Sequence, residues 1–280
     1  MKVYHGLNEF HRLPDTVVTS GTFDGVHIGH QKILKRLQEV ASAENAQSVV
    51  ITFWPHPRMV LNPQHDLKLL HTPEEKIQAL EQFGIDHLLV IKFDESFSRL
   101  SSEQFIQQIL VDKVNTRKLV IGYDHRFGKN REGSFAYLKE NSGRFGFEVE
   151  EIPQQEIHEV GVSSTKIRNA LLAGHIETAN SYLGRDYRLC GTVVKGDQIG
   201  RTIGFPTANL QIEAGYKLIP RDGTYAIRAI YKGTAFKGMI NIGFRPTIGS
   251  GLSHTMEAHL FNFEQQIYGE QLDVRFVRYM

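Results

Sequence analysis

The sequence has 280 residues, of which 41% are hydrophobic and 22% are charged, so it can bury a core and is not a disordered chain. Its formal net charge of +1 provides no broad electrostatic footprint for nucleic acid. The one cysteine, Cys190, excludes a disulfide framework and a cysteine-based zinc site. The first residues have no signal-peptide pattern, and no apolar run reaches the length of a membrane span. We therefore expect a cytoplasmic protein of one large or two ordinary domains.

The first half of the chain alternates strand-like and helix-like segments. The expected strands cover residues 17–23, 48–53, 87–93, 118–123 and 147–152, and the expected helices between them cover residues 31–46, 73–83, 101–114 and 133–141. Thr72 is a predicted N-cap for the second of these helices. This alternation predicts an α/β domain with a mostly parallel sheet covered on both faces. Ligands of such sheets bind beyond the carboxyl ends of the strands.

A glycine-rich turn at residues 21–30, GTFDGVHIGH, joins the end of a buried strand to the start of a helix. Gly21 and Gly29 allow a bulky anion to approach the backbone, and the helix start offers N–H groups and a positive dipole end. His27 and His30 lie three residues apart, so both imidazoles can donate hydrogen bonds to one phosphoryl group. A turn that only caps its helix is the alternative.

Two later turns are expected at the same edge of the sheet. The segment TFWPHP at residues 52–57 follows the second strand, and Phe53 and Trp54 offer flat apolar faces there. The segment GYDHRFG at residues 122–128 places Asp124 at the end of the fourth strand. Ordinary core packing is the alternative for the aromatic residues, and a surface ion pair is the alternative for the carboxylate.

The segment SSTKIR at residues 163–168 begins another predicted helix. Hydroxyl and N–H groups of Ser164 and Thr165, together with the guanidinium of Arg168, would form an anion site at the helix start. A capped surface helix is the alternative.

From residue 187 the pattern changes to short strands separated by glycine-containing turns. These strands cover residues 187–194, 224–231, 235–242, 254–263 and 272–279. Regular short strands with few helices predict an antiparallel barrel. Because the helical pattern ends near Gly184, a predicted C-cap, we expect domains at residues 1–184 and 185–280.

A glycine-containing loop in the second half has the composition of a phosphate-binding loop. The residues suited to this role by N–H groups or positive charge are Lys195, Gly196, Gly200 and Arg201. Thr207 and Asn209 follow with oxygen ligands suited to Mg²⁺. An ordinary loop before a short strand is the alternative.

These motifs, in their order along the chain, resemble those of the bacterial bifunctional riboflavin kinase/FMN adenylyltransferases (FAD synthetases). The turn at residues 21–30 and the SSTKIR segment resemble the nucleotidyltransferase half. The segments GFPTAN at 204–209, NIGFRPT at 241–247 and EAHLF at 257–261 resemble riboflavin kinases. The resemblance implies a Rossmann-like nucleotidyltransferase domain followed by a smaller antiparallel β-barrel kinase domain. It also implies Mg²⁺ as cofactor, riboflavin, FMN and ATP as substrates, and FAD as product.

The resemblance further implies individual roles. His27 and His30 would stabilise charge on the α-phosphoryl group and the departing pyrophosphate, and Arg168 would hold the β- and γ-phosphates. Glu257 would accept the proton of the ribityl hydroxyl, and the threonine and asparagine of the PTAN motif would hold the metal and the phosphates. The other positions expected to contact nucleotide or flavin are Gly21, Phe23, Asp24, Gly29, Phe53, Asp124, Ser164, Thr165, Lys195, Gly196, Gly200 and Arg201.

Two features depart from the family pattern. Trp54 stands where the family often has an acidic residue. The printed chain ends at Met280, after an expected strand, where family members usually continue into a C-terminal helix that helps close the flavin site; we expect that helix to be missing. Two other functions stay open, namely a monofunctional adenylyltransferase with an inactive flavin-binding barrel and a non-catalytic flavin or nucleotide sensor. The sequence does not indicate an oligomeric state.

Overall fold

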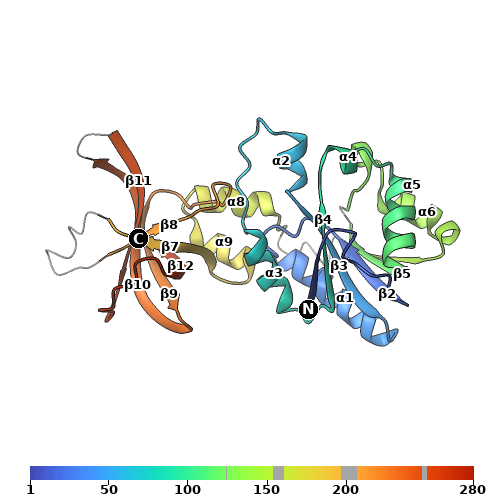
Figure 1. Ribbon diagram of the computed structural model, residues 1–280, viewed down its shortest axis with the longest axis horizontal. Coiled ribbons are helices and arrows are strands. Elements are labelled where there is room, and N and C mark those ends of the chain that lie inside the picture. The colour runs from blue at the N-terminus through green and yellow to red at the C-terminus, as the bar shows by residue number, and fades with distance from the viewer. Residues whose placement is uncertain (124, 154–160, 197–206, 248–250) are drawn as a thin grey trace. The chain divides into compact units, whose positions relative to one another are not determined.

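The computed structural model describes residues 1–123, 125–153, 161–196, 207–247 and 251–280. The chain forms two compact units, residues 1–162 and 163–280 (Figure 1). In the second unit, two helices lie before residue 184, of which the second packs against the first and against strands that follow residue 184. The division of the chain at residue 184 stays a prediction.

The first unit is built on a six-stranded sheet in the order β1-β4-β3-β2-β5-β6, and all of its strand pairs are parallel. The strands are β1 (Lys2–His5), β2 (Thr16–Ser20), β3 (Gln47–Trp54), β4 (His87–Lys92), β5 (Thr116–Gly122) and β6 (Glu148–Ile152). The expected parallel sheet is therefore confirmed. The sequence analysis did not predict the short edge strand β1.

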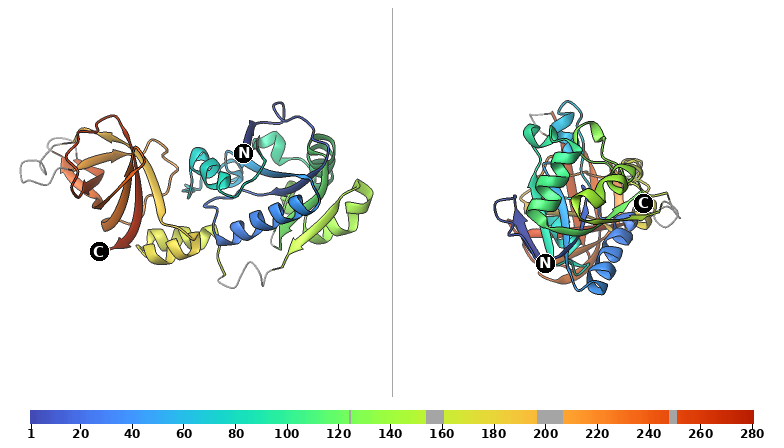
Figure 2. Two further views of the ribbon diagram at one scale, coloured as in Figure 1. Left: turned by 90° about the horizontal axis from the view of Figure 1, so that it is seen from below. Right: turned by 90° about the vertical axis from the view of Figure 1, so that its right-hand side faces the viewer.

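Helices cover both faces of this sheet (Figure 2). The described helices of the first unit are α1 (Ile28–Ala43), α2 (Pro57–Leu61), α3 (Pro73–Glu81), α4 (Glu95–Ser98), α5 (Ser102–Phe105), a π-helix (Ile106–Val114), a short 3₁₀ turn (Lys129–Arg131) and α6 (Phe135–Phe145). Apolar residues of α1 and α3 form one core with the sheet, and those of α5, the π-helix and α6 form the other. Val17 and Val18 of β2 belong to opposite cores, as the two-residue period of a strand requires.

Two helix starts test the sequence reasoning in detail. Helix α3 begins with a capping box, in which Thr72 and Glu75 each bond the other's backbone N–H group. The segment expected as one helix at residues 101–114 begins as α5 and continues as the π-helix, so its hydrogen-bond spacing differs from the expected one.

The order of the strands places β2 between β3 and β5. The chain moves from β2 to β3 on one side and returns to β5 on the other, so the order reverses at β2. Loops leaving the carboxyl ends on either side of such a reversal separate and leave a crevice for ligands. The glycine-rich turn begins directly after β2, at this crevice.

The second unit combines two helices with a closed antiparallel barrel in the order β10-β11-β8-β7-β12-β9. Its elements are α8 (Ser164–Leu172), α9 (Ile176–Leu183), β7 (Tyr187–Val194), β8 (Ala208–Gln211), β9 (Gly223–Tyr231), β10 (Thr234–Thr247), β11 (Gly251–Leu260) and β12 (Gln271–Tyr279). Gly184 ends α9 in the left-handed conformation, with φ of 70°, as its predicted role as C-cap requires. The expected barrel is confirmed. No helix in the described parts of the chain is both long enough and apolar enough to cross a membrane.

Candidate functional site

The glycine-rich turn connects β2 to α1 as the sequence predicts. The N–H group of Gly21 extends the β2–β3 ladder by donating to the carbonyl of Ile51, at 3.0 Å. His27 is the N-cap of α1, and its Nδ1 accepts a hydrogen bond from the N–H group of His30, at 3.3 Å. Gly29 is buried in the first turn of the helix. The strand end, the turn and the positive end of the helix dipole thus meet at one place.

The two histidines of the turn lie face to face. Their ring centroids are 3.7 Å apart and the ring planes differ by 16°. The ring of Phe23 lies 5.1 Å from that of His30 and tilts against it. His27 is 7% exposed, so packing holds its ring in place. A bound phosphoryl group would meet two positioned imidazoles at the start of a helix.

The backbone of this turn adopts conformations that side chains rarely tolerate. Phe23 and Val26 have φ of 46° and 39°, and Gly25 between them has φ of 84°. Each non-glycine residue in this region costs on the order of 1–3 kcal/mol, and such strain is concentrated at functional sites. Phe23 and Val26 are also fully buried, so core packing supports the strained backbone.

Asp24 fixes the turn to a distant part of the chain. Its carboxylate accepts the N–H group of Leu70 at 3.0 and 3.1 Å and the N–H group of His71 at 3.2 Å. The side chain is 2% exposed. Asp24 therefore holds the turn against the segment that precedes α3, and the expected direct contact with nucleotide stays a prediction.

The loops after β3 and β5 reach the same crevice. The hydroxyl of Thr52 donates to the carbonyl of Thr22, at 3.3 Å. Nε2 of His125, which follows β5, lies 3.3 Å from Oγ of Ser20 at the end of β2. These two contacts bring all three predicted turns together. Asp124 lies outside the described residues.

Phe53 packs into an aromatic cluster. Its ring lies 5.9 Å from Phe93 and 5.7 Å from Phe97, and it borders one of the two cores. This contact explains why an aromatic residue stands at this position. Its expected role in holding the flavin stays a prediction.

Lys76 belongs to this part of the molecule, and the sequence analysis missed it. It is 7% exposed in the first turn of α3, and its Nζ lies 3.5 Å from Oγ1 of Thr52. Burial lowers the pKa of its ammonium group to about 8, and the negative charge of Asp24 opposes this shift. A lysine in the first turn of a helix usually lies in solvent, so the sequence carries no signal of its burial.

The SSTKIR segment forms the start of α8 in the second unit. Ser163 is the N-cap, and its Oγ accepts the N–H group of Lys166, at 3.3 Å. Ser164 is half-buried, Thr165 is exposed and Arg168 is 8% exposed. The predicted helix start is therefore confirmed, with Ser163 as its N-cap. The role of Ser164, Thr165 and Arg168 in holding phosphates stays a prediction.

In the barrel, strand pairing brings two predicted residues of the kinase half together. Glu257 of β11 is paired with Asn209 of β8 on one side and with Asn241 of β10 on the other. The hydroxyl of Thr224 on β9 lies 3.2 Å from Oδ1 of Asn241. Paired residues of adjacent strands project from the same face, so a carboxylate lies among amide and hydroxyl groups there.

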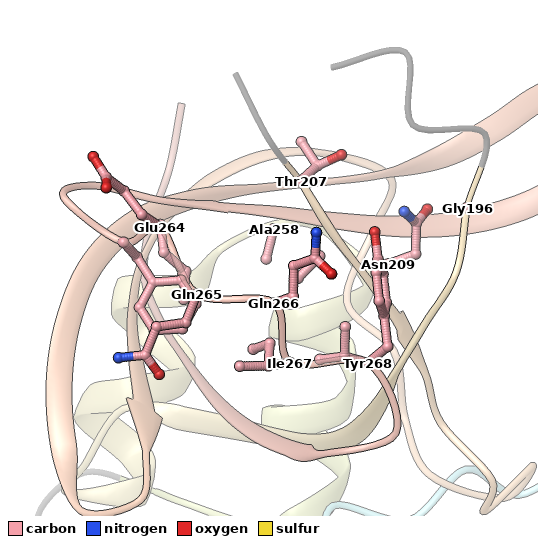
Figure 3. Close-up of a pocket in the computed structure, with 13 residues that line it drawn as sticks. Gly196, Thr207, Asn209, Ala258, Glu264, Gln265, Gln266, Ile267 and Tyr268 are labelled. Carbon is pink, nitrogen blue, oxygen red and sulfur yellow. The ribbon is translucent and has the colours of Figure 1, made fainter. Parts of the chain in front are cut away.

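A cavity of about 220 Å³ lies at the end of the barrel that carries the PTAN motif. Thr207 and Asn209 line it, and Gly196 lies so close to Asn209 that a Cβ atom there would be 2.6 Å from Cγ of Asn209 (Figure 3). The remaining wall comes mainly from the segment after β11, which the sequence analysis did not select. Its lining residues are Phe263, Glu264, Gln265, Gln266, Ile267 and Tyr268. Lys195 is exposed beside the cavity, and Gly200 and Arg201 lie outside the described residues.

The donor set at this cavity fits a hard cation. Thr207 and Asn209 supply neutral oxygen atoms, which are ligands that hard divalent cations accept. Mg²⁺ keeps several water ligands and binds through few protein groups plus the phosphates of its nucleotide. The oxygen atoms present are compatible with the Mg²⁺ that the sequence resemblance implies, and the identity of the cation stays a prediction.

Two family models match the chain, one for each half. The model for FAD synthetase matches residues 10–166, and the model for riboflavin kinase matches residues 183–280. Together they leave only short segments unmatched, and the first match ends within the SSTKIR motif, two residues before Arg168.

Relatives and a solved structure match over nearly the full length. The bifunctional riboflavin kinase/FMN adenylyltransferase of Buchnera aphidicola subsp. Schizaphis graminum is 39% identical, over 98% of this chain and 88% of the relative. The protein of the same name from Haemophilus influenzae is 39% identical, over 99% of this chain and 89% of the relative. A crystal structure named as a macrolide-efflux protein from Streptococcus pneumoniae matches with a TM-score of 0.90 and 30% identity, over 100% of this chain and 91% of that one. The chain therefore belongs to the bifunctional riboflavin kinase/FMN adenylyltransferase family.

Proposed function

We propose that this chain phosphorylates riboflavin to FMN in its barrel and adenylates FMN to FAD in its α/β unit, using ATP for both steps. Matches to both family models favour this function over a monofunctional adenylyltransferase with an inactive barrel. The observation that carries the adenylyltransferase assignment is the stacked pair of His27 and His30 at the start of α1, beside the crevice where the strand order reverses.

In the proposed adenylyl transfer, a phosphate oxygen of FMN attacks the α-phosphorus of ATP. The bond from that phosphorus to the bridging oxygen breaks, and pyrophosphate leaves. Because Nδ1 of His27 accepts a hydrogen bond from His30 N–H, the ring proton of neutral His27 is on Nε2, which can donate to a phosphoryl oxygen. Positioned donors of this kind stabilise developing charge without a covalent intermediate.

The proposed role of Arg168 rests on its place in the SSTKIR motif. A guanidinium group can bind two phosphate oxygens at once, which suits the β- and γ-phosphates of the leaving pyrophosphate. Ser164 and Thr165 would add hydroxyl and N–H donors at the start of α8.

In the proposed kinase step, the terminal ribityl oxygen of riboflavin attacks the γ-phosphorus of ATP, and Glu257 accepts the proton of that hydroxyl. The bond from the γ-phosphorus to the bridging oxygen breaks, and ADP leaves. Asn209 is the strand partner of Glu257, so the base and a phosphate ligand are neighbours. Thr207, Asn209 and the backbone of Gly196 would hold the phosphates, and Mg²⁺ bound with ATP would neutralise part of their charge. ATP would occupy the cavity beside the PTAN motif.

Two variants test this division of labour. Each is incubated with ATP and Mg²⁺, once with riboflavin and once with FMN, and flavin products are separated by chromatography over time. We expect His27→Ala to lower FAD formation by about 10²–10³-fold and to leave riboflavin phosphorylation intact. Glu257→Gln should lower riboflavin phosphorylation and leave the formation of FAD from FMN intact. His11→Ala, at an exposed histidine of the first unit, is the matched control.

Several outcomes would contradict the proposal. If the His27→Ala variant formed FAD at the same rate as the unchanged protein, the proposed role of the histidine pair would be contradicted. Absence of FMN in every preparation would favour the monofunctional alternative, and tight binding of flavin and ATP with no pyrophosphate released would favour a sensor. We also propose a cytoplasmic location, which suits a chain with the single thiol of Cys190.

A further inference from the structure

Several buried polar side chains lie in or next to the glycine-rich turn, among them Ser20, Asp24 and His27. Lys76 is the one buried lysine or arginine among the described residues of the first unit. Lysine is almost never fully buried without a partner. Lys76 also lies near the N-terminal end of α3, where the helix dipole disfavours positive charge. Its location therefore opposes the charged state in two ways.

The ammonium group contacts the glycine-rich turn through one intermediate residue. Nζ of Lys76 lies 3.5 Å from Oγ1 of Thr52, and the same oxygen donates its proton to the carbonyl of Thr22, at 3.3 Å. Lys76 thus donates, Thr52 accepts and donates onward, and Thr22 accepts. Thr22 precedes the strained stretch of the turn that leads to His27 and His30.

The charges around Lys76 come from two elements. Asp24 of the turn attracts the ammonium group, but desolvation has the larger effect and lowers the pKa to about 8. Helix α3 itself carries Glu74 and Glu75, and the carboxylate of Glu75 is engaged in the capping box. Strand β3 contributes the uncharged Thr52. The surrounding groups therefore stabilise the ammonium group of Lys76 only weakly. If stability alone determined the residue at this position, an apolar side chain would be favoured.

We propose that Lys76 is a positioning residue of the adenylyl transfer site, whose ammonium group fixes the Thr22 end of the glycine-rich turn through Thr52. This inference rests on the proposed function of His27 and His30. Lys76 holds one edge of the turn from α3, and Asp24 holds the other edge to the segment before α3. The turn is thereby fixed on both sides while its backbone is strained. A shift of the turn would move both imidazoles away from the reacting phosphate.

The test uses Lys76→Met, which keeps the length of the side chain and removes the charge. The rate of FAD formation from FMN is measured at saturating substrates, and riboflavin phosphorylation in the same chain is the internal reference. We expect FAD formation to fall roughly ten- to hundredfold, since misplacement by about 1 Å can cost 10²-fold. Riboflavin phosphorylation should stay within about twofold. Lys35→Met, at an exposed lysine of α1, is the matched control.

The pH profile separates this role from simple packing. In the unchanged protein, FAD formation should decline above about pH 8, where Lys76 loses its proton. The Lys76→Met variant should lack this decline. A decline of equal size in both proteins would overturn the proposal, as would full FAD formation by the variant.

A second variant tests the path through Thr52. Thr52→Val keeps the shape and removes the hydroxyl, so it should lower FAD formation, and adding Lys76→Met should lower it little further. Fully additive effects would overturn the path. Equal loss of both activities together with a lower melting temperature would show that Lys76 is only structural. If His27→Ala leaves FAD formation unchanged, the proposed histidine site is wrong. If His27→Ala lowers FAD formation but Lys76→Met leaves it unchanged, only the proposed role of Lys76 is wrong.

Discussion

The ring of His30 stacks on the ring of His27, with centroids 3.7 Å apart, while the N–H group of His30 bonds Nδ1 of the same partner at 3.3 Å. Each histidine therefore positions the other through both ring and backbone. His27 is the N-cap of α1 and His30 lies in its first turn, so the helix start positions both residues. Two donors held in this way should act as a unit.

This relationship predicts how substitutions at the two positions combine. His27→Ala and His30→Ala should each lower FAD formation by about 10²–10³-fold, the usual effect of losing one positioned donor. The double variant should be little worse than either single one, because groups that act as a unit are not additive. Steady-state rates of FMN adenylylation check this. If the loss of FAD formation in the double variant equalled the product of the two single losses, the two histidines would act independently of each other.

Asp24→Asn should destabilise the first unit. The carboxylate accepts N–H groups of Leu70 and His71, and an amide offers one oxygen in place of two. Hydrogen bonds to a charged group contribute about 1.5–3 kcal/mol, so a loss of that order is expected in urea unfolding. Asp66→Asn, whose carboxylate is 80% exposed, should change little and is the control. If Asp24→Asn and Asp66→Asn unfolded at the same urea concentration, the proposed anchoring role of Asp24 would be contradicted.

Lys76→Met should raise the stability of the folded chain at neutral pH. The difference between the ordinary pKa of 10.5 and about 8 corresponds to about 3 kcal/mol of cost for the buried charge. Below about pH 8, folding must remove the ammonium group from water, so the full cost applies. As the pH rises from 8 to 10.5, the folded chain releases this proton before the unfolded chain does, and the cost disappears.

Denaturant unfolding at several pH values measures this effect. The stability advantage of Lys76→Met should be largest near pH 7 and should shrink by pH 10.5. An exposed lysine replaced in the same way, Lys35→Met, should show no such trend. If Lys76→Met were less stable than the unchanged protein at pH 7, the contact of Lys76 with Thr52 would contribute more to stability than the desolvation of the ammonium group costs.

Gly196→Ala should impair the kinase half alone. A Cβ atom at this position would lie 2.6 Å from Cγ of Asn209, so the amide must move. We expect riboflavin phosphorylation to fall by about tenfold or more, because a displaced phosphate ligand no longer positions ATP. FAD formation from supplied FMN should persist. Gly215→Ala is the control, since a Cβ atom there meets nothing within 4 Å. If Gly196→Ala left riboflavin phosphorylation unchanged, the proposed role of Asn209 in the kinase step would be contradicted.

The parts of the structure that depend on local chemistry could be predicted from the sequence. The cap at Thr72 and the left-handed Gly184 follow from the preferences of single residues, and both are confirmed. The π-helix at Ile106–Val114 could not be predicted, because its apolar spacing also suits an ordinary helix. The short strand β1 depends on pairing with β4, far along the chain.

The candidate sites show the same limit. The histidine turn and the PTAN motif are contiguous in the sequence, so they could be found there. Lys76 and the cavity wall at residues 263–268 lack a local motif and gain their surroundings only through tertiary contacts. Contiguous motifs can be recognised in a sequence, whereas side chains that pack against them from other elements become visible only in the folded chain.

Strand β8 is four residues long, and two of its residues, Ala208 and Asn209, pair with β11. The distance between the proposed base and its neighbouring phosphate ligand is thus governed by main-chain alignment. A slip of one residue in this pairing would turn Asn209 to the opposite face while Glu257 stayed in place. A single-residue insertion in β8 would therefore silence the kinase even in a chain that retained every one of its reactive side chains.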